Sequence, residues 1–265
     1  MNDVPATPEA PLPDLAQEPP ARGRLLPWLY LLLGVLLDWL SLPPGPFPAA
    51  ILVADVPFLL LLWHDGGKRW KRWALLYGAL HFGIGCRWAA EVTPVFPLAI
   101  AGFLAPVYVL LGAAIRLCVR ARLPYVVSVG LCVVLEEWVR TWWMGGMPWP
   151  ARSLSFAPDA WMLSGTFGSF TLLPAASVLG AYALSFFAGM TSAWASGLPM
   201  LWRRRDMRAD LVRQLAVTAL VPLLFGALLL YWAGDRRNEY EQRTHAIQPG
   251  VRAFEATEHI VMVQG

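Results

Sequence analysis

The stretch PLAIAGFLAPVYVLLGAAIRLC occupies residues 97–118 and carries a single charged side chain, Arg116. A helix needs about 20 mostly apolar residues to cross the hydrocarbon core of a bilayer. These 22 residues meet that requirement in both length and composition. They are therefore predicted to form a membrane-spanning helix, and the rest of the chain is interpreted around them.

Six further stretches have a similar apolar character. They lie at about residues 25–42, 48–63, 73–88, 125–143, 173–201 and 215–232. Charged residues make up 15% of the chain, below the roughly 25% of a soluble domain, and the 14 Trp residues suit the two interfaces of a membrane. The sequence predicts an all-α polytopic membrane protein, built as a seven-helix transmembrane bundle with a long outer loop.

Basic residues gather in alternate connections between these stretches. Fourteen of the 21 Lys and Arg residues lie before the first stretch or at the junctions between the second and third, the fourth and fifth, and the sixth and seventh, with Arg116 among the last residues of the fourth. The opposite connections hold only Arg87, Arg140 and Arg152. Because cytoplasmic loops carry the excess of Lys and Arg, the N-terminus is predicted to be cytoplasmic and the C-terminal tail to lie at the outer face. The net charge of +3 is then a consequence of topology, and no nucleic-acid partner is expected.

The bundle is expected to cover residues 24–233, with other segments around it. Residues 1–23 are acidic and rich in Pro, which predicts a disordered tail. The outer loop at about 144–172 is long enough to suggest a functional role. Residues 234–258 are polar and are interpreted as an outer linker, and HIVMVQG at 259–265 is interpreted as the first strand of an outer domain whose remainder is missing.

Asp38, Asp55 and His81 are ionisable residues that stand inside the first, second and third predicted spans. A charged side chain at the centre of a bilayer costs about 2.5–3.5 kcal/mol on insertion scales, so each needs a reason to be there. The commoner explanation is a polar group bonded between helices or reaching the interface. A functional site is the less common alternative.

A denser cluster stands near the end of the fifth stretch, in LEEWVRTWW at residues 135–143. Glu137 lies three residues before Arg140 and Glu136 lies four before it, so either carboxylate can pair with the guanidinium on one helix face. Such a pair could be a structural clamp. It could instead present Arg140 to a lipid phosphate or to an approaching loop.

No constellation for bond-making chemistry is evident. There is no GxSxG elbow or HExxH motif, and the four His residues are scattered, so neither a metal nor a cofactor is expected. Cys86, Cys118 and Cys132 lie in or beside apolar stretches and are interpreted as buried core residues without a disulfide framework.

Five stretches together resemble one family, the bacterial apolipoprotein N-acyltransferases. The more specific matches are EEWVRTWWMGGMPWPARSLSFAP at residues 136–158 and the terminal IVMVQG. Weaker matches are LSLPPGPFPAAILVADVPFLLLL at 40–62, YGALHFGIGCRWAAEV at 77–92 and LLPAASVLGAYALSFF at 172–187. The last of the specific matches resembles the start of the family's nitrilase-like α/β domain.

The resemblance implies transfer of an acyl chain from a phospholipid to the N-terminal lipidated Cys of a diacylated lipoprotein. It implies a location in the bacterial cytoplasmic (inner) membrane. In this family a Cys nucleophile, a Glu base and a Lys act from the nitrilase-like domain. No position here matches them, so no catalytic residue is assigned and the chain is expected to be inactive alone.

By the same resemblance, Pro148, Trp149, Arg140 and Glu137 are expected to position substrate. The expected partners are the phospholipid donor, the diacylated lipoprotein acceptor and a separate nitrilase-like chain. The alternative is a non-enzymatic lipid-binding or partner-anchoring membrane protein derived from the same scaffold. An unrelated transporter is disfavoured because the two halves show no convincing repeat.

Overall fold

The computed structural model describes residues 25–42, 47–143, 151–156 and 180–203, together with eleven isolated positions between 212 and 231. Within these residues every regular element is helical, which confirms the all-α class for the described part of the chain. The longer helices are α1 (Leu26–Ser41), α4 (Trp70–Gly85), α5 (Phe96–Arg120), α6 (Tyr125–Trp143) and α8 (Ala181–Arg203). The shorter ones are η1 (Pro48–Ala50), α2 (Ile51–Ala54), α3 (Val56–Leu62), η2 (His64–Gly67), η3 (Arg87–Glu91) and η4 (Arg152–Phe156).

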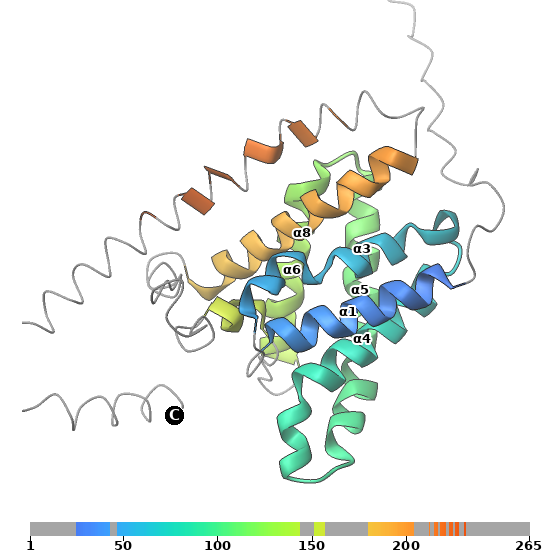
Figure 1. Ribbon diagram of the computed structural model, residues 1–265, viewed down its shortest axis with the longest axis vertical. Helices are drawn as coiled ribbons and strands as arrows, with labels where there is room; N and C mark the ends of the chain where they lie inside the picture. The colour runs from blue at the N-terminus through green and yellow to red at the C-terminus, as the bar shows by residue number, and fades with distance from the viewer. Residues whose placement is uncertain are drawn as a thin grey trace, which may run out of the picture.

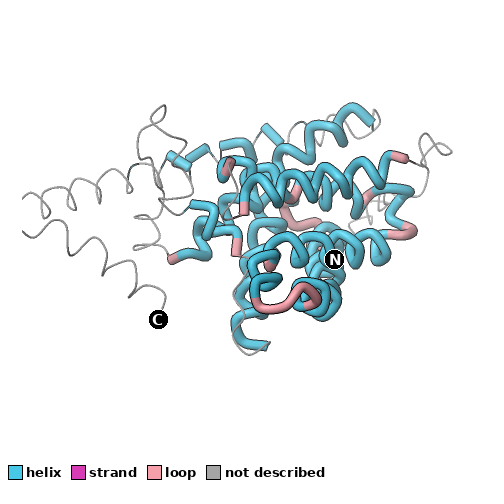
Figure 2. Tube along the Cα trace, turned by 60° about the horizontal axis from the view of Figure 1, so that its bottom comes forward, coloured by secondary structure: helices cyan, strands magenta, loops and turns pink. Residues whose placement is uncertain are grey.

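The helices pack in two groups that share α5 (Figures 1 and 2). Helix α4 lies along α5, and α1 lies against both α3 and α4. On the other side, α6 packs against α5 and α8, while α8 also contacts α2, α3 and η4. The connection through η3 between α4 and α5 projects beyond the other helices at the bottom of Figure 1.

Close helix contacts depend on small residues. A Cβ atom on Gly78 would lie 2.6 Å from the carbonyl oxygen of Ala105, so only Gly allows α4 to come this near to α5. A Cβ on Gly189 of α8 would lie 3.1 Å from the Cα of Gly130 on α6. Small residues at such crossings let backbones approach where packing, rather than apolar burial, drives helix association.

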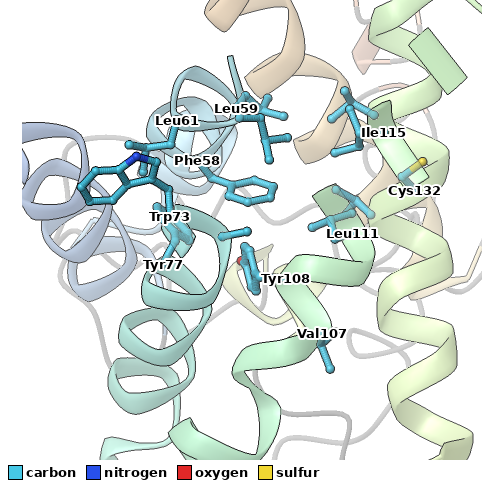
Figure 3. Close-up of a cluster of buried hydrophobic side chains, with 14 of the residues drawn as sticks. Phe58, Leu59, Leu61, Trp73, Tyr77, Val107, Tyr108, Leu111, Ile115 and Cys132 are labelled. Atoms are coloured by element: carbon cyan, nitrogen blue, oxygen red, sulfur yellow. The ribbon is translucent and has the colours of Figure 1, made fainter. Parts of the chain in front are cut away.

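Aromatic side chains from three helices form the centre of the core (Figure 3). The ring centroids of Phe58 and Tyr108 are 4.9 Å apart, and those of Tyr77 and Tyr108 are 5.3 Å apart. Leu111 and Cys132 continue this core between α5 and α6, and both are buried. The prediction of Cys132 and Cys86 as buried residues is confirmed, whereas Cys118 is only half-buried.

Helix α1 shows an inverted pattern of exposure. Its polar residues Asp38 and Ser41 are buried, whereas Leu29, Leu32 and Leu36 are 57%, 64% and 49% exposed. A surface helix of a soluble protein has the opposite arrangement. The outward Leu face and inward carboxylate are what a hydrocarbon environment favours.

One described helix, α5, is both long and apolar enough to cross a membrane. Helix α1 and the 48–62 segment are apolar but shorter. The seven-span bundle, the orientation and the segment boundaries therefore remain predictions, and residues 1–23 and 234–265 lie outside the described part of the chain.

The second predicted span is not a single helix. It is divided into η1, α2 and α3, with Asp55 at the break. Pro57 stands in the first turn of α3, and because Pro has no backbone N–H it cannot donate to Val53, four residues earlier. The unbroken span predicted at 48–63 is therefore wrong, and Asp55 at the break is buried.

Candidate functional site

The two α6 residues predicted to position substrate are deeply buried. Glu137 is 3% exposed and Arg140 is 1% exposed. Pro148 and Trp149, the other two, lie outside the described residues. In the described structure neither Glu137 nor Arg140 presents its charge at the surface, so any action on a lipid headgroup would have to pass through other groups.

The residue at the centre of this region is Arg152, the first residue of η4, which is 1% exposed. Its Nε donates to Oδ2 of Asp55 at 2.7 Å, and its Nη2 donates to Oδ1 at 2.9 Å. This is a two-pronged contact between a planar guanidinium and a carboxylate, the geometry that Arg makes and Lys cannot. Asp55 stands at the N-cap of α3 but does not cap it with its side chain.

Arg152 also contacts both carboxylates of α6. Its Nη1 lies 3.1 Å from Oε2 of Glu136 and 3.2 Å from Oε1 of Glu137. The same Oε1 of Glu137 accepts the backbone N–H of Arg152 at 2.8 Å. A further hydrogen bond runs from Nη2 to the hydroxyl of Tyr108 on α5, at 3.2 Å.

The structure resolves which carboxylate pairs with Arg140. Oε1 of Glu136 lies 2.5 Å from Nε of Arg140, one helical turn away, and the Arg140 guanidinium stands 5.3 Å from the ring centroid of Phe82. Glu137 is turned instead toward Arg152. Glu136 therefore bridges the guanidiniums of Arg140 and Arg152. An approaching loop was one of the partners considered for the Glu–Arg pair, and the segment that reaches it carries Arg152.

We call Asp55, Tyr108, Glu136, Glu137, Arg140 and Arg152 the Arg152 cluster. Its charged members are three carboxylates and two guanidiniums, all buried, and its sixth member is the buried phenol of Tyr108. Burial lowers the pKa of Arg152, but the negative charge of Asp55, followed by smaller contributions including Glu136, outweighs this and holds the pKa well above its ordinary value. Arg152 is therefore a charged member of this cluster.

A second polar pair lies on the α1 side of Tyr108. Nδ1 of His81 on α4 lies 2.9 Å from Oδ2 of Asp38 on α1. The His81 ring packs against Tyr108, with centroids 5.0 Å apart, and against Phe82 at 5.1 Å. Asp38, Asp55 and His81 are thus all polar residues bonded between helices, which is the commoner of the two explanations that their positions allowed.

Within the described residues, the chemistry of the Arg152 cluster is that of a fixed scaffold. Its charges are engaged with one another, and no group of three His, Cys, Asp or Glu side chains there has a metal-binding arrangement. Such a cluster can hold η4, α3 and α6 in fixed positions relative to one another. It has no nucleophile for acyl transfer.

A comparison with protein families decides the relationship. The model of the apolipoprotein N-acyltransferase N-terminal domain matches residues 33–194. This interval is more than half of the 265 residues. The chain belongs to the apolipoprotein N-acyltransferase family.

The match confirms the resemblance drawn from the sequence motifs. The matched interval of the N-acyltransferase domain runs from α1 into α8 and contains every member of the Arg152 cluster and the Asp38–His81 pair. Among curated proteins, none matches the sequence.

Sequence reasoning about this N-acyltransferase domain missed Arg152, which was counted only as a basic residue of an outer loop. One signal could have found it. The loop that follows α6 carries little charge, and Arg152 is a lone cation there, 15 residues after Glu137 and 12 residues after Arg140. An excess of carboxylates on a buried helix end calls for a second cation.

Proposed function

We propose that this chain is the membrane half of an apolipoprotein N-acyltransferase, which moves an acyl chain from a phospholipid to the N-terminal lipidated Cys of lipoproteins. The observation that carries the proposal is the family match over residues 33–194. The inverted exposure of α1 supports a lipid environment for the same region. The proposed setting is the bacterial cytoplasmic membrane.

In the proposed topology seven segments cross the membrane, with the N-terminus in the cytoplasm and the residues after 233 at the outer face. The alternation of basic loops supports this orientation. The length and composition of α5 support its crossing.

The proposed division of labour leaves bond making to a nitrilase-like domain. In the family, a Cys thiolate takes the acyl chain from the phospholipid as a thioester and the amine of the acceptor then displaces it. No position in these 265 residues matches that Cys or its Glu and Lys. The role proposed for this half is to hold the acyl donor and the acceptor where that Cys can reach them, with Pro148 and Trp149 contacting lipid and Glu137 and Arg140 acting from beneath.

The test is acyl transfer in liposomes containing a phospholipid with a labelled acyl chain and a synthetic diacylated lipopeptide. The chain alone is expected to produce no labelled lipopeptide. The chain with a nitrilase-like domain, joined after residue 258 or added separately, is expected to produce it. Turnover by the chain alone would contradict the proposed division. Lipid binding without turnover in any combination would favour the non-enzymatic anchoring function.

A further inference from the structure

We infer that Arg152 is a positioning residue of the acyl-transfer reaction, because its side chain fixes η4 against α3, α5 and α6. This inference rests on the proposed function for its consequence in catalysis. Its structural part stands on the contacts alone and is tested separately.

The hydrogen bonds within η4 are too few to fix its position. This element is a five-residue 3-10 helix, and such short pieces have poor internal hydrogen bonding. Its position comes from contacts with other elements: the Arg152 side chain in the interior, a hydrogen bond at 3.2 Å from the Ser153 backbone N–H to Oγ of Ser185 on α8, and the fully buried ring of Phe156. Arg152 is the member of this set that contacts α3, α5 and α6 together.

These contacts are expected to fix the position of η4 more than they increase the free energy of unfolding. Desolvating a guanidinium and three carboxylates is expensive, and buried ion pairs of this kind often contribute no more stability than apolar residues of similar volume. They do restrict geometry, because the planar guanidinium accepts Asp55 only along one edge and must offer Nη1 to Glu136 and Glu137 at the same time.

The fixed position of Arg152 matters for the reaction because few residues separate it from the motif predicted to contact lipid. The motif predicted to contact lipid ends at Trp149, three residues before Arg152. Three residues of extended chain span at most about 11 Å, so a displacement of Arg152 is expected to be passed along the chain to that motif. The buried Glu137 and Arg140 then act on substrate through Arg152 and η4.

The first experiment measures the position of η4 without requiring catalysis. Ser153→Cys introduces a small thiol at a site that is 7% exposed, and the same chain without this substitution gives the background from the three native Cys residues. Labelling of Cys at 153 by a water-soluble maleimide is expected to be slow, and to become at least about tenfold faster when Arg152→Gln releases η4. Arg152→Lys keeps the charge but loses the two-pronged contact and is expected to fall between them.

The matched control is Arg116→Gln. Arg116 is a half-buried Arg that donates to the carbonyl of Leu62 and stacks on the rings of Trp63 and Trp70. It stands eight residues beyond Tyr108 on α5, about 12 Å along the helix. Loss of these contacts should leave the labelling at 153 unchanged. Equal acceleration by Arg116→Gln would mean general loosening and would overturn the inference, as would unchanged labelling in Arg152→Gln.

The second experiment uses the chain supplied with the nitrilase-like domain. Arg152→Gln is expected to raise the KM for phospholipid about tenfold with a smaller effect on kcat, while Arg116→Gln leaves KM unchanged, because positioning acts on binding and not on the bond-making residues. Asp55→Asn should move KM in the same direction. An inactive wild type would contradict the proposed function and leave the labelling result standing, whereas an active wild type with an unchanged KM in both variants would overturn the positioning role.

Discussion

Removing the guanidinium of Arg152 should cost far more than removing its main partner. In Arg152→Met, the side chain keeps its approximate length, but Asp55, Glu136 and Glu137 remain 3%, 6% and 3% exposed. Glu136 retains Arg140, while Asp55 loses both of its ion-pair contacts. Leaving one partner of a buried pair uncompensated costs about 3–5 kcal/mol, and that loss is expected for the free energy of unfolding.

Asp55→Asn should be milder, at about 1–3 kcal/mol, because Arg152 keeps Glu136 and Glu137 and the amide oxygen still accepts a hydrogen bond. The double variant should lose less than the sum of the two single losses, since the uncompensated Asp55 charge that penalises Arg152→Met is no longer there. The coupling expected for such directly bonded residues is about 1–3 kcal/mol.

The assay is denaturant titration in detergent micelles followed by helical circular dichroism, with Arg116→Gln as the matched loss of one Arg. That control gives up one hydrogen bond to a carbonyl and the contacts of its guanidinium with the Trp63 and Trp70 rings, and should lose about 1–3 kcal/mol. An unfolding free energy of Arg152→Met within about 1 kcal/mol of the wild-type value would refute this prediction. So would two single losses that add without coupling.

Two further predictions concern the packing around the cluster. The double variant Asp55→Arg with Arg152→Asp exchanges the two charges and should fail to restore a folded chain, because the carboxylate at 152 would face Glu136 and Glu137. A thermal unfolding midpoint equal to that of wild type would argue against the three-carboxylate arrangement. Gly78→Ala should lower the unfolding free energy by about 1–3 kcal/mol, because the added Cβ would lie 2.6 Å from the Ala105 carbonyl oxygen. Gly102→Ala on α5, where the added Cβ meets open space, should raise the unfolding free energy by about 0.5–1 kcal/mol. Similar effects at the two sites would contradict the close α4–α5 contact.

The helical class followed from hydropathy because apolar stretches such as 97–118 allow few alternatives in a chain with so little charge. The α2–α3 break at Asp55 did not follow. Pro57 stands in the middle of the predicted span at 48–63, but a Pro inside a span can kink a helix without dividing it. Only the position of Arg152 gives the break a partner for its carboxylate.

The same limit applied to the candidate site. The spacing of Glu136, Glu137 and Arg140 placed all three near one face of a helix, and both pairings remained open because i,i+3 and i,i+4 neighbours are both in reach. What decided between them was Arg152: Glu137 pairs with Arg152, while Glu136 pairs with Arg140 and contacts Arg152 as well. A contact between a loop and a helix 15 residues apart has no periodicity in sequence, so helical patterns cannot report it.

The measurement that tests the central claim most directly is rescue in a bacterium depleted of its own apolipoprotein N-acyltransferase. The chain joined after residue 258 to a nitrilase-like domain that carries Glu, Lys and Cys should restore growth, and its lipoproteins should gain the mass of one amide-linked acyl chain. Stable, membrane-inserted protein that restores neither growth nor that mass would contradict the assignment of this chain as the membrane half of the enzyme.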